Sequence, residues 1–241
     1  MTSFTQYSNV LFDGFISNIR ADDQVNKKRS LLTEILAYYN LSADDLLFVG
    51  FSPLLVAAAT IGESIKVAEI SDRIFDHLIA QGYVVERVSL DTLPPKSASV
   101  VIAVDEYFTF AETDQQQRVL VDQLAAIARD LIITTLRDYK NQDFRDREFS
   151  HPIMVNGSEI NKIYLEHYQY SVHDKNAATS TTYVVTDSLE TFGPYNRRNM
   201  YFKQLAKFSI DAGADSFYVH KNVMYKSVIK KNYEHMITIK F

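Results

Sequence analysis

The sequence of 241 residues contains no cysteine and no tryptophan, and only seven glycines and five prolines. Without cysteine the chain can form neither a disulfide nor a thiolate zinc site, which excludes a disulfide-stapled extracellular scaffold. Long apolar runs are also missing. No stretch reaches the roughly 18 apolar residues of a membrane-spanning helix, and the first residues carry no basic leader. We therefore expect a cytoplasmic protein without a membrane segment.

Several catalytic motifs are absent as well. No glycine run precedes a Lys-Ser or Lys-Thr pair, as a P-loop requires, and no G-x-S-x-G elbow of a hydrolase is present. The six histidines form no H-x-x-x-H or H-E-x-x-H pair, so we expect no metal site. A metal held by His167 or His173 with Glu166 is the alternative, although isolated histidines more often satisfy local hydrogen bonds only.

The charge of the chain is unevenly distributed. Residues 196–241 contain nine Lys or Arg and three acids, a net charge of +6, so residues 1–195 carry −11 of the total of −5. One interpretation is that this basic C-terminal part meets a nucleic acid. The other is that its cations balance the acidic body and keep the surface solvated.

Apolar periodicity predicts alternating helices and strands over the first 136 residues. Helices are expected over residues 23–39, 54–61, 72–80 and 115–129, and strands over residues 46–49, 65–68, 83–90, 99–104 and 131–136. This alternation implies a parallel sheet with right-handed crossovers. Two β-rich runs, at residues 162–172 and 181–186, predict a hairpin. A helix over residues 196–211 and strands over residues 216–225 and 234–241 complete the prediction.

The predicted fold is therefore α/β, with a doubly wound, mostly parallel seven-stranded sheet and an inserted β-hairpin after the fifth strand. With 46% hydrophobic residues, the chain can bury the core of one domain, residues 1–241. We expect a cofactor-binding half (residues 23–136), an inserted connector and hairpin (137–195), and a closing helix and strand pair (196–241). Such sheets bind ligands beyond the carboxyl ends of their strands, which here carry Gly50, Glu69, Asp91 and Asp105.

Two passages carry a resemblance to a known family. LLFVGFSPLLVAAATIGESIKVAE, residues 46–69, places a tight turn after the first strand and an acid 19 residues after Gly50. SLDTLPPKSASVVIAVDEY then leads into and past the fourth strand. The chain resembles class I S-adenosylmethionine-dependent methyltransferases over about residues 27–136. The resemblance implies a Rossmann-like sheet, S-adenosylmethionine as cofactor, and methyl transfer to an unidentified acceptor such as a nucleic acid or a nucleotide-like molecule.

The resemblance also implies a role for particular residues. The turn after the first strand would hold the amino-acid end of the cofactor, Glu69 would accept hydrogen bonds from the ribose hydroxyls, and Asp91 would face the adenine. The implied cofactor-binding residues are Gly50, Phe51, Ser52, Glu69, Asp91, Thr92 and Asp105. Each position also has a purely structural alternative: Gly50 permits a sharp turn, Glu69 is a solvent-facing acid, and Asp91 caps its own loop.

The residues after the fourth strand are the candidates for chemistry. Asp105 and Glu106 would position or deprotonate the acceptor, and Tyr107 would contact it together with two later residues, Lys140 and Tyr168. Tyrosines and cations leading into and along the hairpin can stack on and neutralise a planar anion. The alternative is that Tyr107 belongs to the core and that the hairpin tyrosines form a packing ladder.

The turn after the first strand departs from the family pattern. The family usually has acid-x-Gly-x-Gly-x-Gly, and this chain has Phe48, Gly50, Ser52 and Leu54 at those places. A second hypothesis follows: a non-catalytic, methyltransferase-like binding module whose cofactor site is eroded. A third, another nucleoside- or dinucleotide-binding enzyme, fits the D-x-L-P passage less well.

Overall fold

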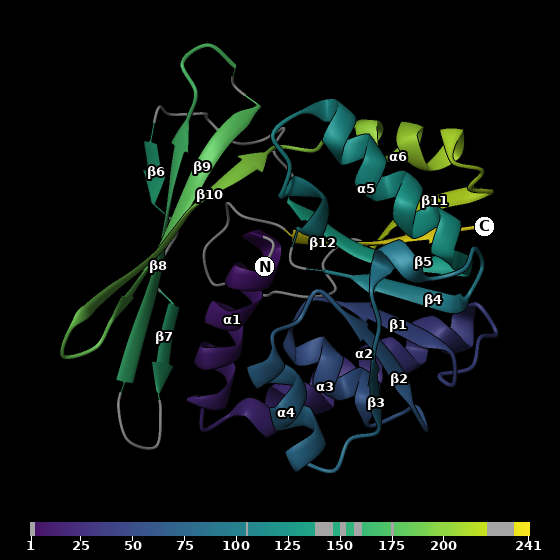
Figure 1. Ribbon diagram of the computed structural model, residues 1–241, viewed down its shortest axis with the longest axis horizontal. Coiled ribbons are helices and arrows are strands. Elements are labelled where there is room, and N and C mark those ends of the chain that lie inside the picture. The colour runs from purple at the N-terminus through teal and green to yellow at the C-terminus, as the bar shows by residue number, and fades with distance from the viewer. Residues whose placement is uncertain are drawn as a thin grey trace. The chain divides into compact units, whose positions relative to one another are not determined.

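The computed structural model describes residues 3–104, 106–137, 147–149, 153–156, 161–174, 176–220 and 234–241 (Figure 1). The helices are α1 (Ser3–Ile16), α2 (Ala21–Tyr38), α3 (Pro53–Ala59), α4 (Asp72–Ala80), η1 (Leu90–Thr92), η2 (Tyr107–Thr109), α5 (Asp114–Ile127) and α6 (Phe202–Asp211). The strands are β1 (Leu46–Val49), β2 (Ile65–Ala68), β3 (Val85–Arg87), β4 (Ala98–Ala103), β5 (Ala128–Arg137), β6 (Arg147–Phe149), β7 (Ile153–Asn156), β8 (Asn161–Tyr170), β9 (Ala177–Val185), β10 (Leu189–Arg198), β11 (Ser216–His220) and β12 (Glu234–Lys240).

The larger sheet has seven strands in the order β11-β12-β5-β4-β1-β2-β3. Strands β1, β2 and β3 pair in parallel, as do β4 and β5, whereas β12 is antiparallel to both β5 and β11. β1 and β4 are buried at every position, which is typical of parallel strands covered on both faces. The predicted mostly parallel, doubly wound seven-stranded sheet is confirmed.

The chain forms two compact units. The first consists of the described residues within 1–89, 149–168 and 180–194, and in it α2 packs on α3. The second consists of the described residues within 90–148, 169–179 and 195–241. There α5 and α6 lie side by side, α5 against β5 and α6 against β11 (Figure 1).

Local chemistry explains where several helices begin. α3 begins at Pro53, a residue suited to the first helical position, and the Ser52 hydroxyl accepts the N–H of Leu54 at 3.0 Å. α5 begins with a capping box, in which Thr113 and Gln116 accept each other's backbone N–H groups. These caps supply partners for N–H groups that have none inside the helix.

The insertion is larger than one hairpin. A separate antiparallel sheet contains β10, β9, β8 and β6 in that order, with β7 also paired to β8. The predicted inserted hairpin is thus confirmed as part of a five-stranded sheet. The helix expected from residue 196 begins only at Phe202, because residues 196–198 belong to β10, the edge strand that pairs with β9.

The bounds of several predicted strands differ from those in the structure. The strand expected over residues 83–90 is shortened to Val85–Arg87, because the chain turns into η1 before the two prolines. β11 ends at His220, and the remainder of the strand expected over residues 216–225 lies outside the described residues. α1 was not predicted from the sequence.

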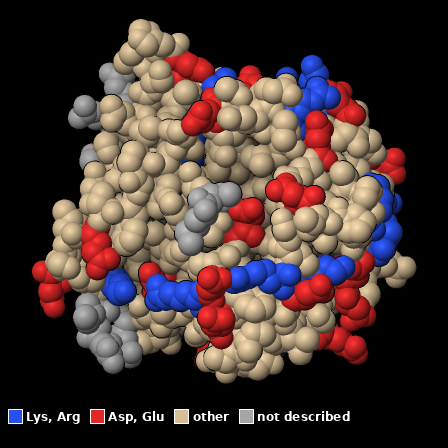
Figure 2. Space-filling view, in the orientation of Figure 1, with Lys and Arg blue, Asp and Glu red and all other residues tan. Residues whose placement is uncertain are grey.

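Acidic and basic side chains lie next to one another over the face seen in Figure 2. Within the described ranges, no helix combines the length and the apolar character that crossing a bilayer requires.

Candidate functional site

The turn after β1 depends on the glycine at its first position. Gly50 has φ of +79°, a left-handed conformation that favours glycine, and its N–H donates to the Ala68 carbonyl at 2.9 Å. Phe51 is only 1% exposed. Ser52 is also buried, and its hydroxyl caps α3. The turn is thus tied to the end of β2 on one side and to the start of α3 on the other.

Glu69 lies beside this turn. β1 and β2 pair in register as far as Val49 and Ala68, so Gly50 and Glu69 follow the paired ends of two parallel strands. Glu69 is half-buried and has φ of +55°. The structure therefore brings together four predicted cofactor residues of the first unit: Gly50, Phe51, Ser52 and Glu69.

The same place is occupied by α1, which sequence reasoning missed. A Cβ atom built on Gly50 would lie 2.7 Å from Cζ of Phe4 and closer still to its Cε1. The Thr5 hydroxyl donates to Oε2 of Glu69 at 3.1 Å, and the Phe51 N–H donates to the Ser8 hydroxyl at 3.3 Å. In this structure the first half of α1 fills the space beside Gly50.

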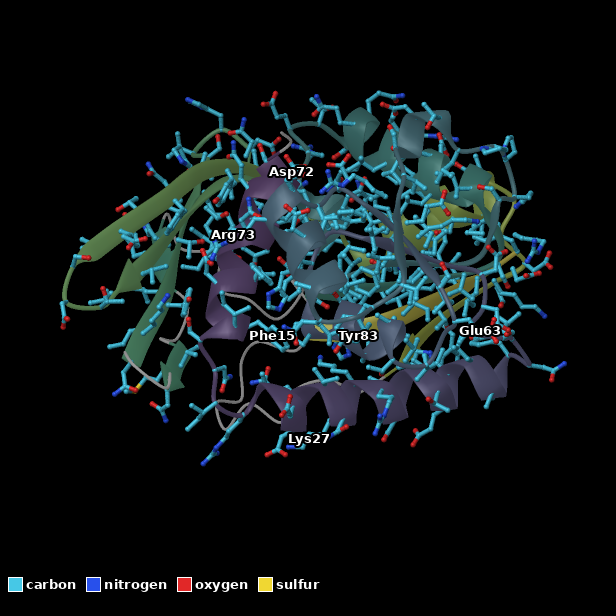
Figure 3. All side chains as sticks on the ribbon, turned by 60° about the horizontal axis from the view of Figure 1, so that its bottom comes forward. Phe15, Lys27, Glu63, Asp72, Arg73 and Tyr83 are labelled. Atoms are coloured by element: carbon cyan, nitrogen blue, oxygen red, sulfur yellow. The ribbon has the colours of Figure 1, made fainter. Side chains whose placement is uncertain are left out.

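The second half of α1 is held by other contacts in the same unit. Asp13 pairs with Arg73 of α4 at 2.5 Å, and Figure 3 shows Arg73 beside α1. The rings of Phe12 and Phe51 meet edge to face, with centroids 5.0 Å apart. Tyr164 of β8 packs closely on Gly14, where an added Cβ would lie 3.1 Å from its Cζ. Burial, and to a lesser extent Asp13 and Glu190, raise the pKa of Tyr164 to about 12.

In the second unit, two predicted cofactor residues lie in η1. Both Asp91 and Thr92 are exposed, and a carboxylate oxygen of Asp91 accepts a hydrogen bond from Nε2 of Gln123 in α5 at 3.0 Å. This contact ties η1 to α5, and the capping role considered for Asp91 stays a prediction.

The described residues directly after β4, Val104 and residues 106–109, are buried. Asp105, a predicted catalytic and cofactor-binding residue, lies outside the described residues. Glu106 is 5% exposed with φ of +61°, and its N–H donates to the Thr135 hydroxyl at 3.4 Å. The carbonyl of Glu106 accepts both the N–H and the hydroxyl of Thr109, at 2.7 and 2.8 Å. Tyr107, a predicted substrate contact, is 4% exposed and meets the ring of Phe108 edge to face.

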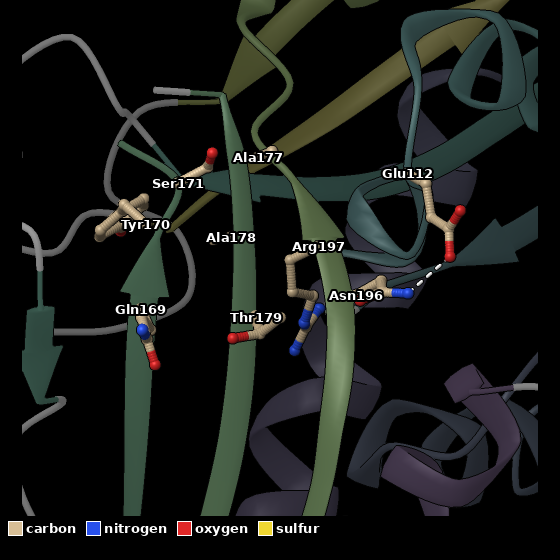
Figure 4. A pocket seen from close by; sticks show the side chains of 9 residues that line it. All are labelled: Glu112, Gln169, Tyr170, Ser171, Ala177, Ala178, Thr179, Asn196 and Arg197. Carbon is tan, nitrogen blue, oxygen red and sulfur yellow. Dashed lines mark hydrogen bonds between the residues drawn. The ribbon is translucent and has the colours of Figure 1, made fainter. Parts of the chain in front are cut away.

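A pocket of about 540 Å³ lies in the second unit, against β8, β9 and β10 (Figure 4). Its lining residues are Glu112, Gln169, Tyr170, Ser171, Ala177, Ala178, Thr179, Asn196 and Arg197. In its wall, Oε1 of Glu112 accepts a hydrogen bond from Nδ2 of Asn196 at 2.5 Å. The pocket is large enough for a small molecule, and it offers hydrogen-bonding groups and both signs of charge.

Arg197 connects the pocket to the segment after β4. Its side chain is 3% exposed, and its Nη1 donates to the Thr109 hydroxyl at 3.0 Å. The guanidinium carbon stands 3.5 Å from the centroid of the Phe110 ring, a cation–π contact. The pocket wall is therefore braced on η2, the element that directly follows Glu106.

The next arginine is used in a different way. Arg198 pairs with Asp114 and, at 2.7 Å, with Asp174. The hydrogen bond from Arg198, with a second from the Asn176 N–H, holds the pKa of Asp174 below its usual value. The hydrogen bond to Asp114 is the main cause that raises the pKa of Arg198. Both described arginines of the basic C-terminal part are thus engaged within the chain.

Two predicted substrate residues remain. Tyr168 is 5% exposed on β8 of the first unit, whereas Tyr170, two residues later, lines the pocket. Lys140 lies outside the described residues. Within the described part of the chain, no three His, Asp or Glu side chains gather as metal ligands. Pocket residues such as Glu112 and Asn196 carried no signal in the sequence, because they lie 84 residues apart and meet only where the loop before α5 contacts β10.

No protein-family model matches the sequence, and no curated protein matches it. Solved structures match its fold. Streptomyces venezuelae DesVI has a TM-score of 0.69 at 11% identity, with 96% of this chain and 97% of that chain covered. An S-adenosylmethionine-dependent methyltransferase from Clostridium acetobutylicum ATCC 824 has a TM-score of 0.66 at 12% identity, covering 92% and 94%.

A third similar structure is S-adenosylmethionine-bound CalS10, an amino pentose methyltransferase from Micromonospora echinaspora. Its TM-score is 0.63 at 10% identity, with 90% of this chain and 91% of that chain covered. In its mostly parallel seven-stranded sheet and its separate antiparallel sheet, the chain has the Rossmann-like fold of class I S-adenosylmethionine-dependent methyltransferases.

Proposed function

We propose that the protein is an S-adenosylmethionine-dependent methyltransferase acting on a small polar acceptor. One observation carries the proposal: at the carboxyl edge of β1 and β2, the carboxylate of Glu69 already accepts a hydroxyl donor next to the positive-φ turn at Gly50. A ribose has two hydroxyl groups that can donate hydrogen bonds to a carboxylate at the end of a strand. Bound S-adenosylmethionine supplies an electrophilic methyl group.

The predicted cofactor residues fit this ligand chemically. Gly50 leaves room for a close approach to the backbone, Glu69 provides two acceptor oxygens for adjacent hydroxyls, and Asp91 in η1 provides an acceptor for an exocyclic amine. Phe51, Ser52, Thr92 and Asp105 complete the proposed set. The space next to Gly50, which Phe4 fills in this structure, is the part that has to open.

The proposed acceptor site is the pocket at β8, β9 and β10. A carboxylate, Glu112, an amide, Asn196, and a buried guanidinium, Arg197, suit a compact molecule with several polar groups. Arg197 is braced on η2, directly after Asp105 and Glu106, the proposed catalytic residues. These two acids would position the acceptor nucleophile or take its proton, with Tyr107, Lys140 and Tyr168 as proposed contacts.

Two arginines that already have partners within the chain favour a small acceptor over a nucleic acid. Arg197 is buried against Thr109 and Phe110, and Arg198 is paired with two carboxylates. Guanidiniums engaged in this way are poorly placed to neutralise phosphates on a surface. The amine of a sugar is the first acceptor to test, since one structure of similar fold is an amino pentose methyltransferase.

Calorimetric titration with S-adenosylmethionine and S-adenosylhomocysteine tests the cofactor. We expect micromolar binding, about −8 kcal/mol. Glu69→Ala should weaken it by about 1.5–3 kcal/mol, the scale of hydrogen bonds to a charged group. Glu63→Ala, which removes an exposed glutamate before β2, is the matched control and should bind like the wild type. Equal affinity in the Glu69 and Glu63 variants would refute the ribose assignment.

A second candidate is a non-catalytic, methyltransferase-like binding module. The contact of the Phe4 ring with Gly50 favours it, as does the complete burial of Leu54 where the family has its third glycine. This candidate predicts neither heat nor a thermal shift with either ligand, in the wild type and in any variant of α1.

A further inference from the structure

The first half of α1 carries side chains that match the proposed cofactor site group by group. Phe4 covers the Cα of Gly50, the Thr5 hydroxyl bonds to Glu69, and the Ser8 hydroxyl takes the backbone donor of Phe51. An apolar body, a hydroxyl for the carboxylate and an oxygen for the turn N–H are the three kinds of group that a nucleoside with an amino-acid tail would bring to the site.

Burial shows that these contacts are built into the structure. Phe4 is 4% exposed, Thr5 is 5% exposed, and Ser8 is fully buried. A buried hydroxyl without a partner costs free energy, and here the partners of both hydroxyls are site groups, Glu69 and the Phe51 N–H. The polar residues on the inner face of α1 are therefore explained by the site itself.

We infer that the first half of α1 is an internal competitor of the cofactor, occupying the Gly50–Glu69 site and leaving it when S-adenosylmethionine binds. This inference rests on the proposed function. Two ligands that need the same Glu69 oxygen and the same space at Gly50 exclude one another. The observed affinity is then the intrinsic affinity multiplied by the fraction of molecules in which α1 is displaced.

The helix is suited to such a displacement. Its first turn contains no acidic residue to favour the helix N-terminus, and the N–H groups there have no partner inside the helix. Its second half is anchored separately, through the Asp13–Arg73 ion pair and the contact of Gly14 with Tyr164. The first turns can therefore open while the rest of α1 stays in place.

Variants of α1 in the full chain test the inference by calorimetry. Thr5→Val keeps the shape of the side chain and removes the donor to Glu69, and the double variant F4A/T5V also vacates the space at Gly50. We expect the double variant to bind S-adenosylmethionine about tenfold more tightly than the wild type. Gln6→Ala, which changes an exposed residue of the same turn, is the matched control and should leave the affinity unchanged.

Hydrogen exchange adds a second measurement that does not depend on any variant. In the wild type, added S-adenosylmethionine should speed the exchange of the amides at the start of α1 and leave those of α2 unchanged. Slower exchange in α1 would mean that the helix closes over the ligand, which overturns the competitor role. Thermal unfolding of each variant confirms that the compared proteins are folded.

The outcomes separate this inference from the proposed function. If the wild type binds S-adenosylmethionine as tightly as the double variant, or more tightly, the inference is overturned and the proposed methyltransferase function is unaffected. Binding by the double variant alone supports both. Absence of binding in the wild type and in every folded variant overturns both and favours the non-catalytic module.

Discussion

At the scale of single residues, Gly50 has two reasons to be glycine. Its φ of +79° lies in the left-handed region, and the Phe4 ring occupies the position that a side chain would take. The first reason applies to any sharp turn of this kind. The second exists only because α1 packs against this turn. The contributions of backbone conformation and of side-chain crowding can therefore be separated by experiment.

Gly50→Ala is expected to lower the free energy of unfolding by about 2–4 kcal/mol, combining the left-handed backbone penalty with overpacking against Phe4. Gly82→Ala provides the control, because Gly82 has φ of +83° and nothing lies within 4 Å of an added Cβ. That variant should lose only about 1 kcal/mol. Urea unfolding followed by circular dichroism measures both, and equal losses would show that Phe4 does not press on residue 50.

At the scale of elements, the glycine-poor turn has a structural explanation. Ser52 was predicted to bind the cofactor, and in the structure its hydroxyl accepts the N–H of Leu54 at the start of α3. A helix of seven residues gains much from such a cap, since short helices are marginal by themselves. Serine at the place of the second family glycine thus stabilises the helix that follows the turn.

Ser52→Ala should therefore cost about 1 kcal/mol of stability, and Ser52→Gly only a few tenths, because glycine is tolerated at a cap. Chemical denaturation of both variants checks the order. The glycine variant also has a glycine where the methyltransferase pattern has its second one, so its affinity for S-adenosylmethionine reports on the turn with little change in stability. An alanine variant as stable as the wild type would contradict the capping role.

At the scale of the whole molecule, the stability of the folded chain reports which class of ligand it binds. A ligand that binds only the folded chain raises its stability, by about 2.7 kcal/mol at a hundred times its dissociation constant. For a chain of this size, where each kcal/mol raises Tm by about 2–4 °C, that corresponds to a rise in Tm of roughly 5–10 °C. We expect this shift with S-adenosylmethionine, with a further shift when an amino sugar is added, and none with a single-stranded oligonucleotide at physiological salt.

An oligonucleotide shift that disappears at high salt would instead favour a nucleic-acid acceptor. The basic C-terminal part would then be its electrostatic contact.

Much of the fold could be predicted because its signals are local. The strand residues 46–49 and 65–68 and the helix residues 72–80 were predicted with the bounds that the structure has. Apolar runs between turn residues and an amphipathic repeat specify such elements without reference to the rest of the chain. The neighbouring strand ends then place Gly50 beside Glu69, since parallel strands end at one edge of a sheet.

α1 was missed for a physical reason. Its inner face mixes Phe4, Thr5, Ser8 and Phe12, and the two hydroxyls interrupt the apolar stripe that marks a helix facing a core. The repeat of Phe4, Ser8 and Phe12 every four residues was the available signal. Serine and threonine on that face make sense only once their partners, Glu69 and the Phe51 N–H, are known.

The sequence by itself determined the alternation of strands and helices, the glycine turn after β1 and the acid at the end of β2, because each depends on residues close together in the chain. Only the tertiary structure decided what lies against that turn and where the pocket forms. Both depend on contacts between distant segments, such as Thr5 with Glu69 and Glu112 with Asn196. Such contacts follow from how the elements pack, which no local pattern of residues encodes.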